Sequence, residues 1–169
     1  MNQIPLVDLG AQHAAVAGEV AEGWQQVLAR TAFIDGPQVA AFENEYAAFI
    51  GAGHCVGVGN GTDAIEMALR GLGVGEGDEA IMPANTFIAT AEAVHRTGAT
   101  PVLVDCADDG TYLMDCAATA AAVTPRTRAI IPVHLYGQAA PVEQLMPLAE
   151  QAGAAVLEDA AQSQGNKRE

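Results

Sequence analysis

The sequence is poor in basic and aromatic residues, and both shortages exclude classes of protein. Seven lysines and arginines stand against 21 acidic residues, so the formal net charge of the 169-residue chain is −14. A field of that sign repels nucleic-acid phosphates and anionic membrane surfaces, and we expect neither as a partner. Only 5% of the residues are aromatic, whereas 50% are hydrophobic and 18 are glycine. This mixture favours an α/β protein with tight turns between strands and helices.

The chain also lacks targeting and metal-binding features. Its first residues carry no basic stretch and no sustained apolar run, so we expect no signal peptide, and no run is long enough to span a bilayer. The three cysteines, Cys55, Cys106 and Cys116, are odd in number and lack the spacing of metal ligands. The four histidines are scattered. We therefore expect reduced thiols, no metal site and a cytoplasmic location.

Helix-like and strand-like segments alternate along the chain. Apolar residues at helical spacing predict a helix that begins near Thr62 and others at 13–30, 38–50, 87–97 and 141–152. Short apolar runs predict buried strands at 55–59, 80–82, 101–104, 129–133 and 154–157. Strands buried on both faces and joined through helices imply a largely parallel sheet with helices on both sides.

The first predicted strand ends in Gly59-Asn60-Gly61-Thr62-Asp63, which turns directly into a helix. Glycines let the backbone come close to a ligand, the helix N-terminus presents free N–H groups, and Thr62 adds a hydroxyl, which together suit a phosphate. A tight turn with a threonine cap explains the segment equally well. The spacing from Gly57 is G-x-G-x-G, and the next strand ends in Pro83 where an acid is wanted, so a Rossmann dehydrogenase is excluded.

Two other strands end in residues that suit a planar, charged ring. The last strand runs into Glu158-Asp159-Ala160-Ala161-Gln162, and a carboxylate there is costly unless a cation or several donors meet it. A pyridinium nitrogen is such a partner and Gln162 could reach a ring oxygen; alternatively, Asp159 caps the next turn. Phe87 begins a helix at the same edge, where it can lie flat on a ring or belong to the core. The convergence of these features on one sheet edge, where α/β proteins bind ligands, favours a site.

Taken together, these residues make the chain resemble the DegT-type sugar aminotransferases, a branch of the fold-type-I pyridoxal-phosphate enzymes. The resemblance runs from Ile4–Leu9 to Glu158–Gln162, nearly the whole chain. Its other motifs are Gly61-Thr62-Asp63-Ala64, Gly77-Asp78-Glu79, Pro83 with Thr86-Phe87, Gly98-Ala99-Thr100-Pro101-Val102, Thr124-Pro125-Arg126-Thr127 and Pro132-Val133-His134-Leu135-Tyr136-Gly137. The resemblance implies the three-layer α/β large domain of fold type I, with a mostly parallel sheet.

The family pattern implies pyridoxal 5'-phosphate as cofactor. It implies that Gly61 and Thr62 hold the phosphate, Phe87 stacks on the ring, Asp159 pairs with the pyridine nitrogen and Gln162 contacts the ring hydroxyl. The implied reaction moves an amino group from an amino acid, expected to be L-glutamate, to the keto group of a nucleotide-linked deoxysugar. Gln162 resembles members that act on 3-keto sugars more than those that act on 4-keto sugars. Family members are homodimers with shared active sites.

One departure from the family bears on catalysis. The Schiff-base lysine of the family lies some tens of residues beyond the Asp159 block, and the only lysine here, Lys167, matches a surface position. We therefore expect no catalytic residue in this chain and interpret residues 1–169 as a truncated large domain, without its remainder and without the small domain. His134 and Tyr136 belong to a family motif, and we expect a packing role for both.

Two alternatives stay open. One is a dehydratase on the same scaffold, which carries a histidine at the position of the missing lysine. The other is a non-catalytic cofactor-binding or regulatory protein. The sequence beyond Glu169 would separate them.

Overall fold

The computed structural model describes residues 7–168, and along the sequence it divides into two compact units between Gly57 and Val58. In its described part the first unit contains two helices, α1 (Leu9–Arg30) and α2 (Pro37–Ile50). The two helices expected there are thus present. Residues Ile4–Leu6 of the family resemblance lie outside the described residues.

Helix α1 begins earlier than predicted, at Leu9, because Asp8 caps it: the Asp8 carboxylate accepts a hydrogen bond of 3.0 Å from the N–H of Ala11. Helix α2 begins with Pro37, whose fixed φ suits a first helical position. Neither helix has the length and apolar character needed to cross a membrane, and the same holds for the other helices described.

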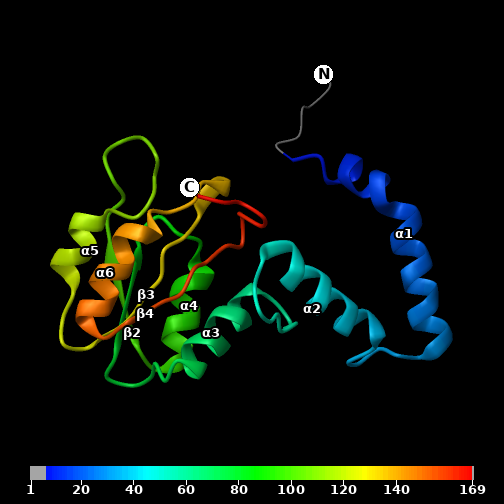
Figure 1. Ribbon diagram of the computed structural model, residues 1–169, viewed down its shortest axis with the longest axis horizontal. Coiled ribbons are helices and arrows are strands. Elements are labelled where there is room, and N and C mark those ends of the chain that lie inside the picture. Colours follow the sequence, from blue (N-terminus) through cyan, green and yellow to red (C-terminus); the bar gives the residue numbers. More distant parts are fainter. Residues whose placement is uncertain (1–6, 169) are drawn as a thin grey trace. The chain divides into compact units, whose positions relative to one another are not determined.

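The second unit alternates helices and strands (Figure 1). Its elements are α3 (Gly61–Gly71), β1 (Glu79–Pro83), α4 (Ile88–Thr97), β2 (Thr100–Val104), α5 (Cys116–Ala122), β3 (Thr127–Ile130), the 3-10 turn η1 (Leu135–Gly137), α6 (Val142–Ala152) and β4 (Ala155–Val156). All four strands are parallel, in the order β2-β1-β3-β4.

The sheet is the middle of three layers. Met82 of β1 packs with Leu69 of α3 and with the apolar side of α4, whereas its neighbour Ile81 packs on the opposite face with Leu145 of α6. Figure 1 shows α3 and α4 on one side of the strands and α5 and α6 on the other. Because successive strand residues point to opposite faces, buried strands need cover on both. The predicted three-layer α/β fold with a parallel sheet is confirmed.

The prediction of a buried strand at 55–59 was wrong. Within residues 7–168 this segment pairs with no strand, Cys55 is only partly buried, and Val56 is 76% exposed. A strand requires a neighbour for its N–H and C=O groups. Here the N–H of Gly57 instead donates to the carboxylate of Glu43 at 2.7 Å. An apolar run alone cannot show whether such a neighbour exists.

Two smaller features also differ from the sequence-based expectations. The strand predicted at 129–133 begins earlier, at Thr127, and ends at Ile130, because Pro132 has no N–H with which to continue the ladder. Val133 then forms an isolated bridge with Asp159. Helix α5 was not predicted, since its run of small residues gives no periodic apolar stripe.

At the start of β1, the buried carboxylate of Glu79 forms hydrogen bonds with the loop before β3. Glu79 is 6% exposed and accepts hydrogen bonds from the hydroxyl of Thr124 and, at 3.0 Å, from Nε of Arg126. The Thr124 hydroxyl and then the Arg126 guanidinium lower the pKa of Glu79 from its ordinary value. This cluster lies at the amino ends of the strands, opposite the edge that carries the predicted site.

Candidate functional site

Asp159 lies at the carboxyl end of the sheet, just after β4, and is 8% exposed. Its backbone joins the neighbouring segment: its N–H donates to the carbonyl of Pro132 at 2.9 Å, and its carbonyl accepts from the N–H of His134 at 3.1 Å. These bonds hold Asp159 in register with the segment after β3. They explain why a residue beyond a two-residue strand is still fixed in place.

The carboxylate of Asp159 has neutral donors on both oxygens. Oδ2 accepts a hydrogen bond of 2.7 Å from the hydroxyl of Thr90, and Oδ1 accepts one of 3.2 Å from the N–H of Ala161. In the part of the chain that the structure describes, no cation pairs with it. A buried carboxylate ordinarily has a cation or several donors. The bond to Ala161 is the local turn contact that the sequence left as an alternative, and both donors are neutral, so a positive partner could still balance the buried charge.

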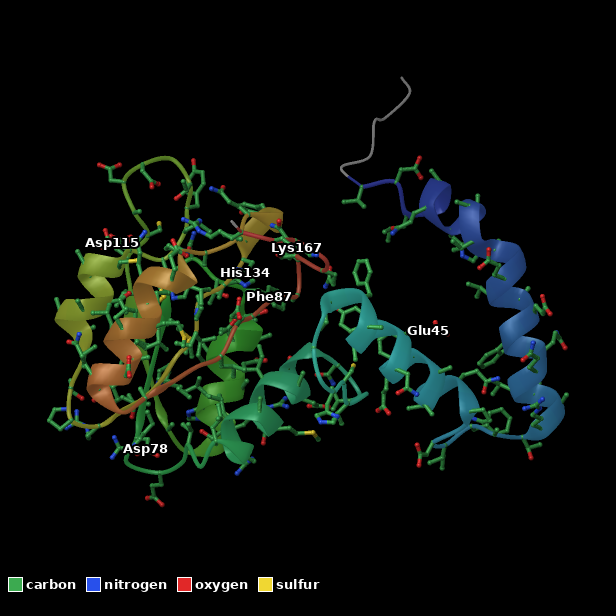
Figure 2. The ribbon with its side chains drawn as sticks, in the orientation of Figure 1. Glu45, Asp78, Phe87, Asp115, His134 and Lys167 are labelled. Atoms are coloured by element: carbon green, nitrogen blue, oxygen red, sulfur yellow. The ribbon has the colours of Figure 1, made fainter. Side chains whose placement is uncertain are left out.

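Phe87 immediately precedes α4, one helical turn before Thr90, and its ring is 72% exposed. It is therefore not part of the core of the described structure, and its face is available to a planar ligand. Figure 2 shows Phe87 and His134 close to one another in this view and Asp78, which precedes β1, well away from both. Helix α4 thus brings an exposed aromatic ring and a hydroxyl bound to Asp159 to the same edge.

Gln162 contacts the turn η1 on the same edge. The backbone N–H of Tyr136 donates to Oε1 of Gln162 at 2.7 Å. Tyr136 adopts the left-handed conformation, with a φ of 57°, which a tyrosine rarely does. Its ring is 79% exposed, so the expected packing role of Tyr136 was wrong.

His134 is buried and ties η1 to the end of β4. Its Nδ1 accepts the N–H of Ala140 at 2.9 Å, and its Nε2 lies 2.8 Å from Oε2 of Glu158. Because a backbone N–H can only donate, Nδ1 carries no hydrogen, and Nε2–H donates to Glu158. His134 therefore does pack, as expected, and it also fixes the segments that carry Asp159 and Gln162.

Gly61 and Thr62 form the first turn of α3. The cap of this helix is Asn60, whose side chain accepts from the N–H of Asp63 at 2.9 Å, so the alternative of a threonine cap is wrong. Among residues 7–168 the N–H groups of Gly61 and Thr62 meet no acceptor, as is usual at a helix start. A Cβ added at Gly61 would meet nothing within 4 Å. The turn is thus open to an anion.

Hydrogen bonds connect some of the predicted site residues to neighbouring elements of the same sheet edge, but not all of them. Hydrogen bonds link Asp159 to helix α4 and Gln162 to η1. Gly61 and Thr62 are related to them only through the packing of α3 against α4. Sequence reasoning missed Thr90, since a threonine within a helix gives no sign of a distant partner. Lys167 lies on the exposed final segment (Figure 2).

Two comparisons of sequence identify relatives. The profile of the DegT/DnrJ/EryC1/StrS aminotransferase family matches residues 15–169. A UDP-N-acetyl-3-dehydro-alpha-D-glucosamine 3-aminotransferase from Acidithiobacillus ferrooxidans is 51% identical over 162 residues, which cover 96% of this chain. The match covers 44% of that relative, so the chain spans less than half its length.

Solved structures share the fold. The crystal structure of DesV from S. venezuelae, in complex with a ketimine intermediate, has a TM-score of 0.94 and 43% identity, covering 98% of this chain and 44% of that one. The structure of NtdA from Bacillus subtilis with bound cofactor PMP has a TM-score of 0.91 and 31% identity, covering 98% of this chain and 38% of that one.

Proposed function

Because the chain belongs to the DegT/DnrJ/EryC1/StrS aminotransferase family, we propose that it is the partial cofactor-binding large domain, residues 1–169, of a pyridoxal-phosphate-dependent sugar aminotransferase. The whole protein transfers an amino group from L-glutamate to the keto group of a nucleotide-linked sugar. It works in the cytoplasm as a homodimer. The proposal rests on the family and on the edge of the sheet that carries Asp159.

The single observation that carries the cofactor is the buried, cation-free carboxylate of Asp159. A protonated pyridine nitrogen supplies the positive charge that this group lacks among the described residues. The cofactor contributes the electron sink that amino transfer requires, and the protein tunes it. The task of Asp159 is to hold a proton on the ring nitrogen.

The remaining predicted residues each match one part of the same cofactor. The open first turn of α3, with the N–H groups of Gly61 and Thr62, suits the phosphate. The exposed ring of Phe87 offers a stacking face. Gln162 commits its amide oxygen to Tyr136, so its NH2 group is the part left for a ring oxygen. Each of these residues therefore suits a different part of pyridoxal phosphate.

The lysine that binds the cofactor covalently is proposed to belong to a part of the protein other than this chain. Lys167 lies on an exposed segment, and only its backbone N–H makes a hydrogen bond, to Asn166 at 2.9 Å, among the described residues. Capturing an aldehyde requires an amine aimed at it.

The homodimer is supported by apolar side chains that the first unit leaves uncovered. On α1 they are Val16, Val20 and Trp24, and on α2 they include Phe42 and Phe49, all at least 45% exposed. Apolar surface of this extent favours burial against another chain or another part of the same protein. Light scattering of the whole protein would give the oligomeric state.

The proposed amino acceptor is a sugar with its keto group at C3, which is the position named for the relative from Acidithiobacillus ferrooxidans. The test supplies the whole protein with pyridoxal phosphate, L-glutamate and a nucleotide-linked 3-keto or 4-keto sugar, and detects amino sugar by mass spectrometry. We expect amino-sugar product with the 3-keto substrate. Turnover with simple 2-oxo acids but with no keto-sugar nucleotide would refute the assignment. Loss of a hydroxyl from the sugar without amination would identify a dehydratase.

A further inference from the structure

Thr90 differs from Thr97 and Thr119, two other buried helical threonines, in where its hydroxyl points. It lies in the first turn of α4 and is 0% exposed. A threonine in a helix often turns its hydroxyl to a carbonyl of the preceding turn, as Thr97 does with Val94 at 2.7 Å. The hydroxyl of Thr90 instead donates to Oδ2 of Asp159 at 2.7 Å. The contact therefore serves Asp159 and not the helix.

The direction of the hydrogen bonds follows from counting protons. An ionised carboxylate can only accept, and a hydroxyl has one proton, which Thr90 gives to Asp159. The hydroxyl of Thr86 lies 2.8 Å from that of Thr90 and must be the donor in that contact. Both protons therefore point toward the carboxylate, and bonds aligned in this way strengthen one another.

We propose that Thr90 is a positioning residue that orients the Asp159 carboxylate and keeps it ionised toward the ring nitrogen of the cofactor; this rests on the proposed function. A hydrogen bond to the charged form of an acid favours that form. Asp159 and the ring nitrogen share one proton, and the Thr90 hydroxyl favours its location on the nitrogen. Without that hydroxyl the proton moves toward Asp159, and the ring loses positive charge.

The test uses pyridoxamine phosphate isotope-labelled at the ring nitrogen, bound to the whole protein. This probe needs no lysine because it is held without a covalent bond. The nitrogen-NMR chemical shift reports the proton on the ring, and a titration gives the affinity. We compare the wild type with Thr90→Val, which removes the hydroxyl at nearly constant shape, and with Thr90→Ser, which restores it. Thr97→Val is the matched control, because it removes a hydroxyl from the same helix that does not contact Asp159.

The wild type, Thr90→Ser and Thr97→Val are expected to give the chemical shift of a protonated nitrogen. Thr90→Val is expected to shift toward the unprotonated value and to bind about tenfold to a hundredfold more weakly, the usual worth of a hydrogen bond to a charged group. A Thr90→Val protein with the wild-type chemical shift and an affinity within about twofold of wild type would overturn the inference.

If circular dichroism shows that Thr90→Val does not fold, the same NMR measurement on Thr86→Val tests the inference instead. Losing the outer hydroxyl should move the chemical shift in the same direction by a smaller amount, and a wild-type shift in that variant would also overturn the inference. Failure of the wild-type protein to bind pyridoxamine phosphate would instead overturn the proposed function.

Discussion

The backbone N–H of Tyr136 and the side-chain oxygen of Gln162 are 2.7 Å apart, and this contact decides which half of the amide is available to a ligand. An N–H group can only donate, so the amide oxygen accepts from Tyr136 and the NH2 group is the donor left for a ligand. A ligand atom at this position is therefore an acceptor, as a deprotonated ring hydroxyl is.

Gln162→Glu tests this assignment. The new carboxylate can still accept the N–H of Tyr136, but it offers no donor and places negative charge beside the ring oxygen. We expect the affinity of the whole protein for pyridoxamine phosphate to fall by about tenfold or more, measured by fluorescence titration. Gln151→Glu, at an exposed position of α6, adds the same charge elsewhere and should bind normally. Equal affinity in both variants would refute the contact.

Asp159→Asn should keep the fold and remove the anion that faces the ring nitrogen. Breaking a buried pair by removing one partner typically costs about 3–5 kcal/mol, so turnover with a keto-sugar nucleotide should fall by orders of magnitude. Asp109→Asn, in an exposed loop where Asp109 accepts from Thr111, serves as the control. Near-wild-type turnover in Asp159→Asn would mean that Asp159 is only the acceptor for the turn at Ala161.

Gly61→Ala separates the phosphate site from the fold. An added Cβ meets no protein atom within 4 Å, and alanine suits a helix better than glycine, so the melting temperature should not fall. The methyl group would instead occupy space proposed for the phosphate, and we expect about tenfold weaker pyridoxamine phosphate binding. Gly71→Ala, in the last turn of the same helix, is equally unobstructed and should bind normally. Unchanged binding in Gly61→Ala would exclude close approach of the phosphate.

Glu79 should make stability depend on pH. Its pKa in the folded protein is lowered from 4.5, so the folded state binds its proton more weakly than the unfolded state does. The stabilisation is therefore fully present above pH 4.5 and is lost as pH falls toward the folded value. Urea denaturation across acid pH should show wild type and Glu79→Gln converging at low pH. A constant difference between them would contradict this, and Glu150→Gln, at an exposed site, should resemble wild type throughout.

The chain as printed should not capture pyridoxal phosphate through Lys167. Capture requires an amine held against the aldehyde, and this side chain makes no hydrogen bond with the described residues. After incubation with equimolar pyridoxal phosphate, dialysis and then borohydride reduction, mass spectrometry should find no label on Lys167. A label that survives dialysis and disappears in Lys167→Ala would show that this chain carries its own nucleophile.

Features of the fold that depend on local spacing could be predicted from the sequence. Ile65 and Leu69 recur at helical spacing, and both are buried on α3. The apolar runs around Ile81 and Ile130 became strands covered on both faces. The run at 55–59 looked the same, but a strand exists only where another strand accepts its hydrogen bonds, and local pattern does not contain that information.

For the candidate site, too, some residues could be predicted from the sequence and others could not. Asp159, Gln162 and Phe87 could be proposed because parallel strands bring their carboxyl ends to one edge. The hydroxyl of Thr90 and the left-handed backbone of Tyr136 could not, because both depend on partners far away in the sequence. The sequence alone does not distinguish the exposed loop of Asp109 from the buried turn of Asp159. Of the two carboxylates, Asp159 is the one that is buried without a cation among the described residues.

The bond between Thr90 and Asp159 closes a loop of 69 residues, and β4 lies at the end of the strand order in the described sheet. Contacts between residues so far apart in the sequence form late in folding. Closing a long loop costs conformational entropy before the contact contributes any stabilisation. We expect α3, α4 and β1, which are close in sequence, to assemble first, and the segment around Asp159 to dock last. Pulse-labelling hydrogen exchange would follow this through the amide of Asp159, which bonds Pro132. Early protection of that amide would contradict this folding order. Late protection would mean that a newly made chain acquires its candidate ligand site only when folding is nearly complete.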